Sequence, residues 1–316
     1  MLFMISPAKK MVDAGDTFAW RDMPRFLSQA RELLDALQAL SYDEAKALWK
    51  CSDALAELNY GRVREMDIDA GPACTPAVFS YEGIQYQNMA PQVMTEAQLD
   101  YLQEHLRILS GFYGVLRPFD AVVPYRLEMQ AKLAVGETRG LYGYWGSRLY
   151  EALAADLRQQ AGKATCGEGP RAAVRRISEH ALDGENGAVL GDRERLDGER
   201  FAAACAVDCI PIASAASEPA IVNLASVEYA KAVLPHAKAA VKAGSPVRIL
   251  TCLFGTVRDG KLVQRSTEAK AARGTFVRWC AENAVERAAD FKRFDAAGYA
   301  FDRELSTDDT FVFAKR

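Results

Sequence analysis

The chain has 316 residues, of which 50% are hydrophobic and 26% charged, an ordinary globular mixture that excludes disorder of the whole chain. The net charge of −3 at pH 7 excludes a protein coated in positive charge, although residues 228–316 hold 16 basic and 11 acidic side chains. No apolar run approaches the roughly 18 residues of a membrane span, and the short apolar start is followed, not preceded, by its positive charges, unlike a signal peptide.

The seven cysteines are scattered and odd in number, which does not indicate a disulfide framework. We therefore expect a cytoplasmic protein that is reduced and holds no metal and no cofactor. Cys205 and Cys209 could share a helix face and bind a metal together with Cys166, but small buried thiols are the favoured interpretation. The three histidines have no metal-ligand spacing.

Apolar periodicity and turn residues predict the elements in chain order. In the first half they predict a strand at 2–5, helices at 24–40, 42–49 and 52–64, a strand at 77–81, and helices at 96–109 and 145–160. In the second half they predict a strand at 220–224, a helix at 227–233, a strand at 247–257 with a hairpin into 262–266, a helix from 267, and one or two strands within 299–313.

Two of the predicted helices carry the signature of a capping box. Ser41 is followed three residues later by Glu44, and Thr95 by Gln98. In this arrangement the cap side chain and the later side chain each satisfy a backbone N–H of the first turn. Both helices should therefore begin directly after their cap residues.

The mixture of helices and strands lacks a regular βαβ rhythm, which favours an α+β fold over a doubly wound sheet. No Gly-x-Gly-x-x-Gly or Walker-type loop occurs, so a nucleotide-cofactor fold has no support. The stretch from Gly162 to Pro219 is rich in Gly, Ala, Arg and Glu and has a weaker pattern. We interpret it as an insertion between two better-patterned halves.

The densest cluster of informative residues begins at Leu109-Ser-Gly-Phe-Tyr-Gly. Two glycines three apart, Gly111 and Gly114, could bring backbone N–H groups to a phosphate, and Arg107 and Arg117 could add charge. The alternative is a helix C-cap glycine followed by a turn glycine.

Arg126 and Glu128 are two residues apart, so on a strand they would share one face. Arg126 could clamp a phosphate, with Glu128 orienting it or acting as a base. The alternative is a structural salt bridge.

Lys270 and Arg273 lie three apart near the start of a predicted helix and share one face. Basic side chains in a first turn oppose the helix dipole, which is easier to understand if they bind an anion. The alternative is a solvated helix face. Lys9, just after the first strand, means little by itself.

Several segments occur in the order and approximate spacing of the YaaA peroxide-stress family, which this chain resembles: MISPAK, HLRILSGFYGVLRPFDAVVPYRLEM, LYGYWG, IVNLASVEY and AKAARG. The resemblance implies a single α+β domain over 1–316, with a peripheral insertion at about 162–219. It also implies a helix-hairpin-helix element at Leu109 to Gly114.

The resemblance further implies a cytoplasmic protein of the peroxide response that limits free iron and binds duplex DNA, largely without sequence specificity. We expect it to be a monomer. In the AKAARG segment, Ala271 occupies a position where many members of the family have a second lysine, so this chain carries one positive charge fewer there. The implied DNA-binding residues are Lys9, Arg107, Gly111, Gly114, Arg117, Arg126, Lys270 and Arg273.

A second hypothesis is an enzyme that acts on a nucleotide or a nucleic acid. Its candidate catalytic residues are Tyr125, Arg126, Glu128 and Lys270, gathered around one pocket. A deep, closed pocket would favour this enzyme, whereas an open basic groove would favour DNA binding.

Overall fold

The computed structural model describes residues 1–13, 18–69, 74–165 and 219–315. The chain divides into two units, Met1–Arg158 with Glu218–Arg316, and Gln159–Ser217. The predicted insertion at about 162–219 lies almost entirely outside the described residues, so its peripheral position stays a prediction.

One mixed sheet dominates the larger unit, with the strand order β13-β14-β15-β11-β10-β1-β5-β6 and with β12 paired to β11. The strands are β1 (Leu2–Ile5), β5 (Leu106–Ser110), β6 (Gly114–Leu116), β10 (Ala220–Asn223), β11 (Arg248–Arg258), β12 (Lys261–Val263), β13 (Asp295–Ala296), β14 (Tyr299–Asp302) and β15 (Thr310–Lys315). The strands β5, β1, β10, β11 and β15 run parallel, and antiparallel strands flank them at both edges.

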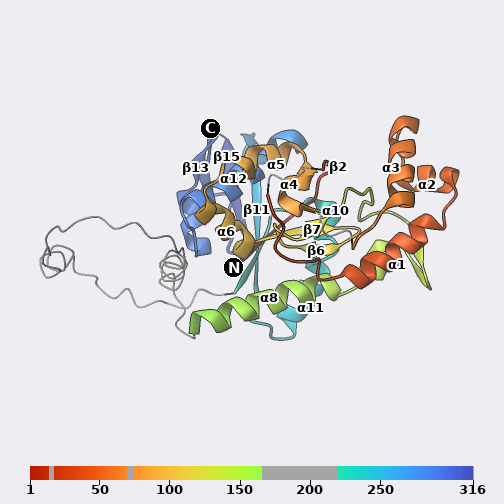
Figure 1. The fold of residues 1–316 in the computed structure, drawn as a ribbon. Helices are drawn as coiled ribbons and strands as arrows, with labels where there is room; N and C mark the ends of the chain where they lie inside the picture. The colour runs from red at the N-terminus through yellow and green to blue at the C-terminus, as the bar shows by residue number, and fades with distance from the viewer. Residues whose placement is uncertain (14–17, 70–73, 166–218, 316) are drawn as a thin grey trace, which may run out of the picture. The chain divides into compact units, whose positions relative to one another are not determined.

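Helices surround this sheet, and α12, α5 and α6 lie grouped together (Figure 1). The helices are α1 (Leu27–Gln38), α2 (Tyr42–Trp49), α3 (Asp53–Glu65), α4 (Ala77–Ser80), α5 (Ile84–Met89), α6 (Glu96–His105), α7 (Leu141–Trp145), α8 (Arg148–Thr165), α10 (Val227–Ala230), α11 (Leu234–Lys242) and α12 (Ser266–Glu282). Two 3-10 helices are η3 (Pro91–Val93) and η4 (Ala288–Arg293). Within the described residues, no helix has the length and apolar character to cross a membrane.

Both predicted capping boxes are confirmed. The Ser41 side chain accepts from the N–H of Glu44, and the Glu44 side chain accepts from the N–H of Ser41 at 2.8 Å. Thr95 and Gln98 make the same exchange at the start of α6. These bonds fix the first turn of each helix, as their three-residue spacing predicts.

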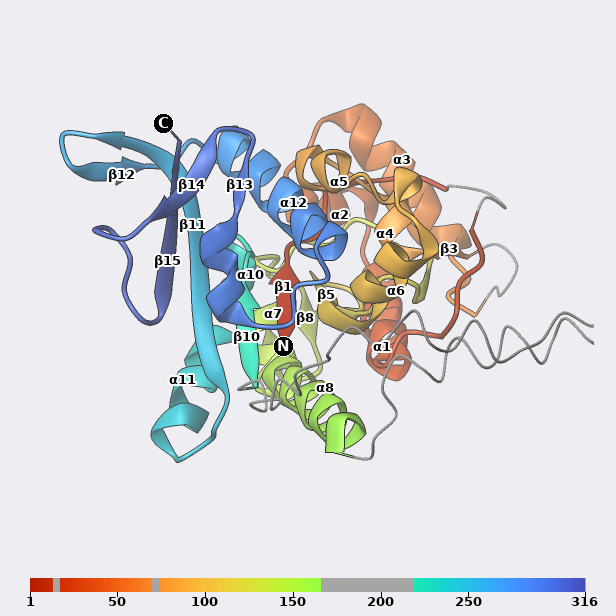
Figure 2. The same ribbon diagram turned by 90° about the vertical axis from the view of Figure 1, so that its left-hand side faces the viewer.

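The two faces of β1 are covered by different helices. Successive side chains of a strand point to opposite faces, so Phe3 and Met4 face different layers. The ring of Phe3 packs against Phe276 of α12, whereas Arg107, in register with Met4, reaches Asp156 of α8. In Figure 2, β1 lies between these two helices.

Two predicted elements differ from the structure in type, and others, such as the helix predicted at 145–160, differ in their bounds. Residues 77–80 form the short helix α4 instead of a strand. The helix predicted at 96–109 ends at His105, and its last residues form β5 instead. All five residues of β5 are buried, so the strand lacks the polar–apolar alternation that would have marked it as extended.

Short pairs of strands hold the remaining loops. They are β2 (Lys10–Met11) with β4 (Tyr81–Glu82), β3 (Thr75–Pro76) with β7 (Ala121–Val122), and β8 (Ala134–Val135) with β9 (Thr138–Arg139). The α+β expectation is confirmed at this level, since helices mix with parallel and antiparallel strands. The parallel centre of the main sheet was not predicted.

Candidate functional site

The loop that follows β7 carries the residues Tyr125, Arg126 and Glu128. These residues lie in a loop and not on a strand, and the preceding Pro124 has no N–H to donate to a strand ladder. The loop passes directly over Gly111, where an added Cβ would lie 2.5 Å from the carbonyl oxygen of Leu127. Gly111 is therefore required for the loop to pack against the β5–β6 turn.

Glu128 is the centre of a small ion-pair cluster. Its Oε2 lies 2.8 Å from Nζ of Lys9, and its Oε1 lies 3.2 Å from Nη2 of Arg126. The Lys9 side chain is 66% exposed, whereas that of Arg126 is 11% exposed. The structure thus brings three predicted residues together, and the predicted salt bridge between Arg126 and Glu128 is present.

Glu228 joins this cluster from the start of α10, and sequence reasoning missed it. Burial raises the pKa of Glu228, and the negative charge of Glu128 raises it further, whereas the backbone N–H of Gln130, 3.3 Å from its Oε1, opposes the change. The residue follows the end of β10, and nothing local in the sequence relates it to a loop 98 residues away.

Two serines tie together the carboxyl ends of the neighbouring parallel strands. Ser6 follows β1 and Ser226 follows β10, and their hydroxyl oxygens lie 3.1 Å apart. The Ser226 N–H also donates to Oγ of Ser6 at 2.8 Å. Residues from distant parts of the chain meet at this edge because parallel strands place their carboxyl ends side by side.

Arg273 of α12 is a partly buried cation without an acidic partner among the described residues. Its Nε is enclosed and has no hydrogen-bond acceptor. Burial lowers the pKa of its guanidinium, an effect that the Cys252 thiol of β11 partly opposes. Lys270, one turn earlier, is exposed. Within the described part of the chain, no hydrogen bond or ion pair joins Arg126 to either residue, so a shared site stays a prediction.

Close packing between α12 and α5 surrounds Arg273. Gly274 lies so near the backbone carbonyl of Gln85 that a side chain at this position would force the helices apart. Nε2 of Gln85 is also buried without a partner, as is Nε of Arg126. Three side-chain donors, on Arg126, Arg273 and Gln85, are therefore enclosed without an acceptor from the described part of the chain.

Tyr125 contacts a different set of residues from Arg126 and Glu128. Its hydroxyl lies 2.5 Å from Oγ of Ser110 and 2.8 Å from the hydroxyl of Tyr81. Burial raises the pKa of Tyr125 to about 12, although both hydrogen bonds oppose this shift. Among the described residues, the Tyr125 hydroxyl makes no hydrogen bond to Arg126 or Glu128, so the common pocket of the enzyme hypothesis stays a prediction.

The glycine hairpin is not a helix-hairpin-helix element. Ser110 and Gly114 are paired across an antiparallel hairpin of β5 and β6, so strands, not helices, flank the turn. Gly114 has φ of +76°, and an added Cβ would lie 2.8 Å from Phe26 and 2.9 Å from Trp145. Both glycines serve close packing inside the protein, and neither presents an open backbone nest to a phosphate.

Arg107 and Arg117 belong to another network. Arg107 is 4% exposed, and its Nε donates to Asp156 at 2.6 Å. Its Nη1 also donates to the carbonyl oxygen of Leu106, so these donors are already bonded within the protein and are not available to the phosphates of a duplex. Arg117 lies 3.9 Å from both Asp22 and Asp156. Both arginines contact carboxylates away from Lys9 and Glu128.

Two cavities in the described part of the chain lie outside the candidate site. One, of about 480 Å³, is lined by α7 and the β8–β9 hairpin. The other, of about 280 Å³, is lined by Arg107, Arg117 and their acidic partners. Among the described residues, no group of three or more His, Cys, Asp or Glu side chains is arranged to hold a metal ion.

The chain is similar to known bacterial proteins over nearly its whole length. It is 40% identical over 315 residues to a "UPF0246 protein" of Pediococcus pentosaceus, an alignment that covers 100% of this chain and 98% of the relative. It is 39% identical over 313 residues to one of Lactiplantibacillus plantarum, covering 99% and 98%. A relative from Lachnoclostridium phytofermentans is 36% identical over 315 residues, covering 100% and 96%.

The family model described as "Peroxide stress protein YaaA" matches residues 1–166 and 206–305. Both matched ranges carry the site: the first contains Lys9, Arg126 and Glu128, and the second contains Glu228 and Arg273. The chain therefore belongs to the YaaA family of peroxide stress proteins.

Proposed function

We propose that this protein binds the phosphates of duplex DNA at the site of Lys9, Arg126, Lys270 and Arg273, largely without sequence preference, as part of a cytoplasmic response to peroxide. We propose further that it does so as a monomer. The membership in a peroxide stress family supports the physiological setting. The contacts with DNA are argued from the charges of the site.

The enclosed Nε of the partly buried Arg273 carries this proposal. A buried charged donor without an acceptor costs on the order of 1–3 kcal/mol or more of stability. Arg273 and Arg126 each enclose such an Nε. Positions that weaken the fold in this way are expected where a ligand supplies the missing partner. Phosphate oxygens are strong acceptors for guanidinium groups.

The exposure of the lysines favours an extended ligand over a small substrate. Lys9 and Lys270 are exposed, and neither cavity described above is lined by the four proposed residues. An open set of cations suits a polymer that runs across the surface. Contacts to phosphates carry no sequence information by themselves, so little sequence preference is expected.

DNA binding also offers a physical route to protection from iron. Duplex DNA keeps a condensed layer of cations, and lysines and arginines that contact its phosphates release them. Ferrous ions held in this layer would be released with the others. Hydroxyl radicals formed from peroxide would then arise away from the DNA, and this is the way in which we propose that the protein limits iron-dependent damage.

The test compares two arginines of the same helix. Arg273→Met should weaken binding of a fluorescent 30-base-pair duplex by at least about tenfold, because a charged hydrogen bond to phosphate is lost. Arg278→Met is the control, since Arg278 forms only a partly exposed pair with Glu282, and such pairs contribute little. Fluorescence anisotropy measures both affinities.

Thermal melts separate the loss of a contact from the loss of the fold. Arg273→Met removes an enclosed donor without an acceptor, so its melting temperature should equal or exceed that of the wild type. Equal DNA affinity of Arg273→Met and the wild type would contradict the proposal. In that case the enzyme hypothesis would be tested next, by an assay for turnover of a nucleotide substrate.

A further inference from the structure

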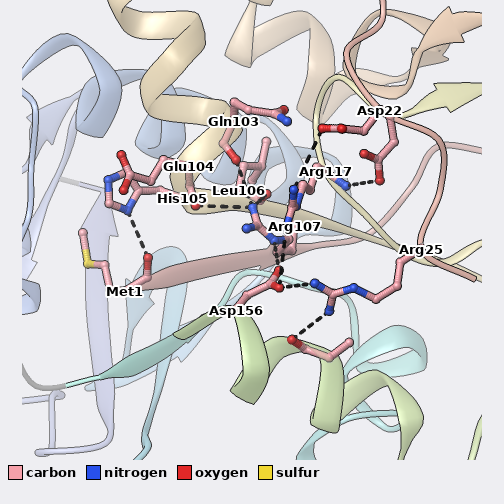
Figure 3. A network of polar contacts seen from close by, with 12 residues as sticks. Met1, Asp22, Arg25, Gln103, Glu104, His105, Leu106, Arg107, Arg117 and Asp156 are labelled. Carbon is pink, nitrogen blue, oxygen red and sulfur yellow. Dashed lines mark hydrogen bonds and ion pairs between the residues drawn. The ribbon is translucent and has the colours of Figure 1, made fainter. Parts of the chain in front are cut away.

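A second charged site lies on the α8 face of the sheet, away from the proposed DNA contacts. Three arginines and three aspartates line a cavity of about 280 Å³ together with Met23 and Val115. Figure 3 shows how Arg25, Arg107, Arg117, Asp22 and Asp156 converge there. The arginines come from distant segments, before α1, on β5 and just after β6.

Two of these arginines are held firmly by the protein. Arg107 donates through Nε to Asp156 at 2.6 Å and through Nη1 to the carbonyl oxygen of Leu106, also at 2.6 Å. Arg25 donates to Asp156 and, through Nη1, to the carbonyl oxygen of Ala152 at 3.0 Å. Asp156 carries one negative charge but contacts two guanidinium groups, so it neutralises only one of their two positive charges.

Arg117 is held only loosely. Its Nη1 lies 3.9 Å from Asp22 and its Nη2 lies 3.9 Å from Asp156, both too far for hydrogen bonds. Its side chain is 34% exposed. The N–H donors of its guanidinium line the cavity near two carboxylates but make no hydrogen bond to them. An anion in the cavity could accept hydrogen bonds from these donors without breaking an existing one.

The charge of this cavity depends on Asp120. Burial and, to a smaller extent, the charge of Asp22 raise the pKa of Asp120 to about 7. A hydrogen bond from the backbone N–H of Arg117, at 2.8 Å, and the charges of Arg117 and Arg107 oppose the shift. Below about pH 7, three arginines face two ionised aspartates, and the cavity is positive.

We propose that this cavity binds a small phosphate-type oxyanion, either inorganic phosphate or the terminal group of a small phosphate ester, with Arg117 as the main ligand. The site goes beyond the proposed DNA binding. Its volume is slightly below the range of ordinary ligand pockets, which suits a small anion with few attached atoms and excludes a duplex. Guanidinium groups bind such oxyanions through paired N–H donors.

A purely structural network makes a different prediction from an anion site. The Arg107–Asp156 pair fastens α8 to β5, and it would do so whether or not the cavity is occupied. Arg117 adds little to that fastening because it makes no side-chain hydrogen bond to the network. Its substitution therefore tests anion binding without removing the structural pair.

Isothermal titration calorimetry of the full chain with sulfate is the first test, because sulfate keeps its charge between pH 6 and pH 8. Sulfate should bind saturably at pH 6, and Arg117→Gln should weaken it at least about tenfold. Arg158→Gln should bind like the wild type, since Arg158 is an exposed arginine of α8 that makes no contact with the cavity. Both variants should melt like the wild type.

The pH dependence adds a second, independent test. Sulfate affinity should fall severalfold from pH 6 to pH 8 in the wild type, as Asp120 ionises, and should stay nearly constant in Asp120→Asn. Titrations with inorganic phosphate and with ribose 5-phosphate at one pH then compare the two proposed ligand classes. The class whose representative binds more tightly is the one that the cavity favours. No saturable binding of any of the three, or equal affinity in Arg117→Gln, would overturn the proposal.

Discussion

At the scale of single residues, enclosed charge is the feature that the structure adds to the sequence. Arg126 and Arg273 were identified as candidate anion ligands by their type and spacing, and both prove to be partly buried with an enclosed Nε. Burial and the lack of an acceptor could not be predicted, because they depend on loops and helices that are distant in sequence. The same holds for Glu228, which only the folded chain brings to Glu128.

Asp120 gives the sharpest prediction at this scale. Its pKa in the folded protein is about 7, above the 3.8 of an unperturbed aspartate. The folded state thus binds this proton more tightly than the unfolded state does. The stabilising contribution is complete below about pH 4 and is lost as the pH rises through 7, at about 1.4 kcal/mol per unit of pKa difference.

Asp120→Asn should remove this contribution while keeping an oxygen for the N–H of Arg117. Its free energy of unfolding, relative to the wild type, should increase from pH 4 to pH 7 and then level off, by a few kcal/mol in total. Urea denaturation at intervals from pH 4 to pH 8 measures both curves. A constant difference between the two proteins across this range would show that Asp120 titrates normally in the fold.

At the scale of elements, signals between residues within one helical turn predicted the structure reliably, whereas the pattern of a fully buried segment did not. The caps at Ser41 and Thr95 were predicted because both partners of each box lie within one turn. Strand β5 was predicted as the end of a helix because no turn residue separates it from α6, and because its fully buried residues do not follow the strict alternation of a half-exposed strand. The hairpin after β5 was mistaken for a phosphate-binding turn, since two glycines three apart fit both structures.

Gly114→Ala tests the structural role of this hairpin. Its φ of +76° and its contacts with Phe26 and Trp145 leave no room for a Cβ. The variant should lose about 1–4 kcal/mol of stability, from backbone strain and crowding together. Its DNA affinity per folded molecule should equal that of the wild type, as judged by gel shift at matched folded concentration. Weaker binding by the fully folded variant would restore the turn as a phosphate site.

At the scale of the whole molecule, the parallel sheet assembles the site. β1 lies between β5 and β10, which follow it by about a hundred and about two hundred residues. Such long crossovers leave no βαβ rhythm in the sequence, so the arrangement could not be predicted from periodicity. The same sheet places Ser6 beside Ser226, and it separates the Arg107 network from the proposed DNA contacts.

The salt dependence of DNA affinity tests the central claim most directly. If Lys9, Arg126, Lys270 and Arg273 each contact a phosphate, the logarithm of the association constant should fall with the logarithm of salt concentration at a slope of about −4, and equally for duplexes of unrelated sequence. Each phosphate contact contributes about −0.9 to the slope, so the Arg126→Gln/Arg273→Met double variant, which loses two contacts, should have a slope of about −2. An affinity independent of salt, a strong preference for one sequence, or an unchanged slope in the double variant would contradict the account.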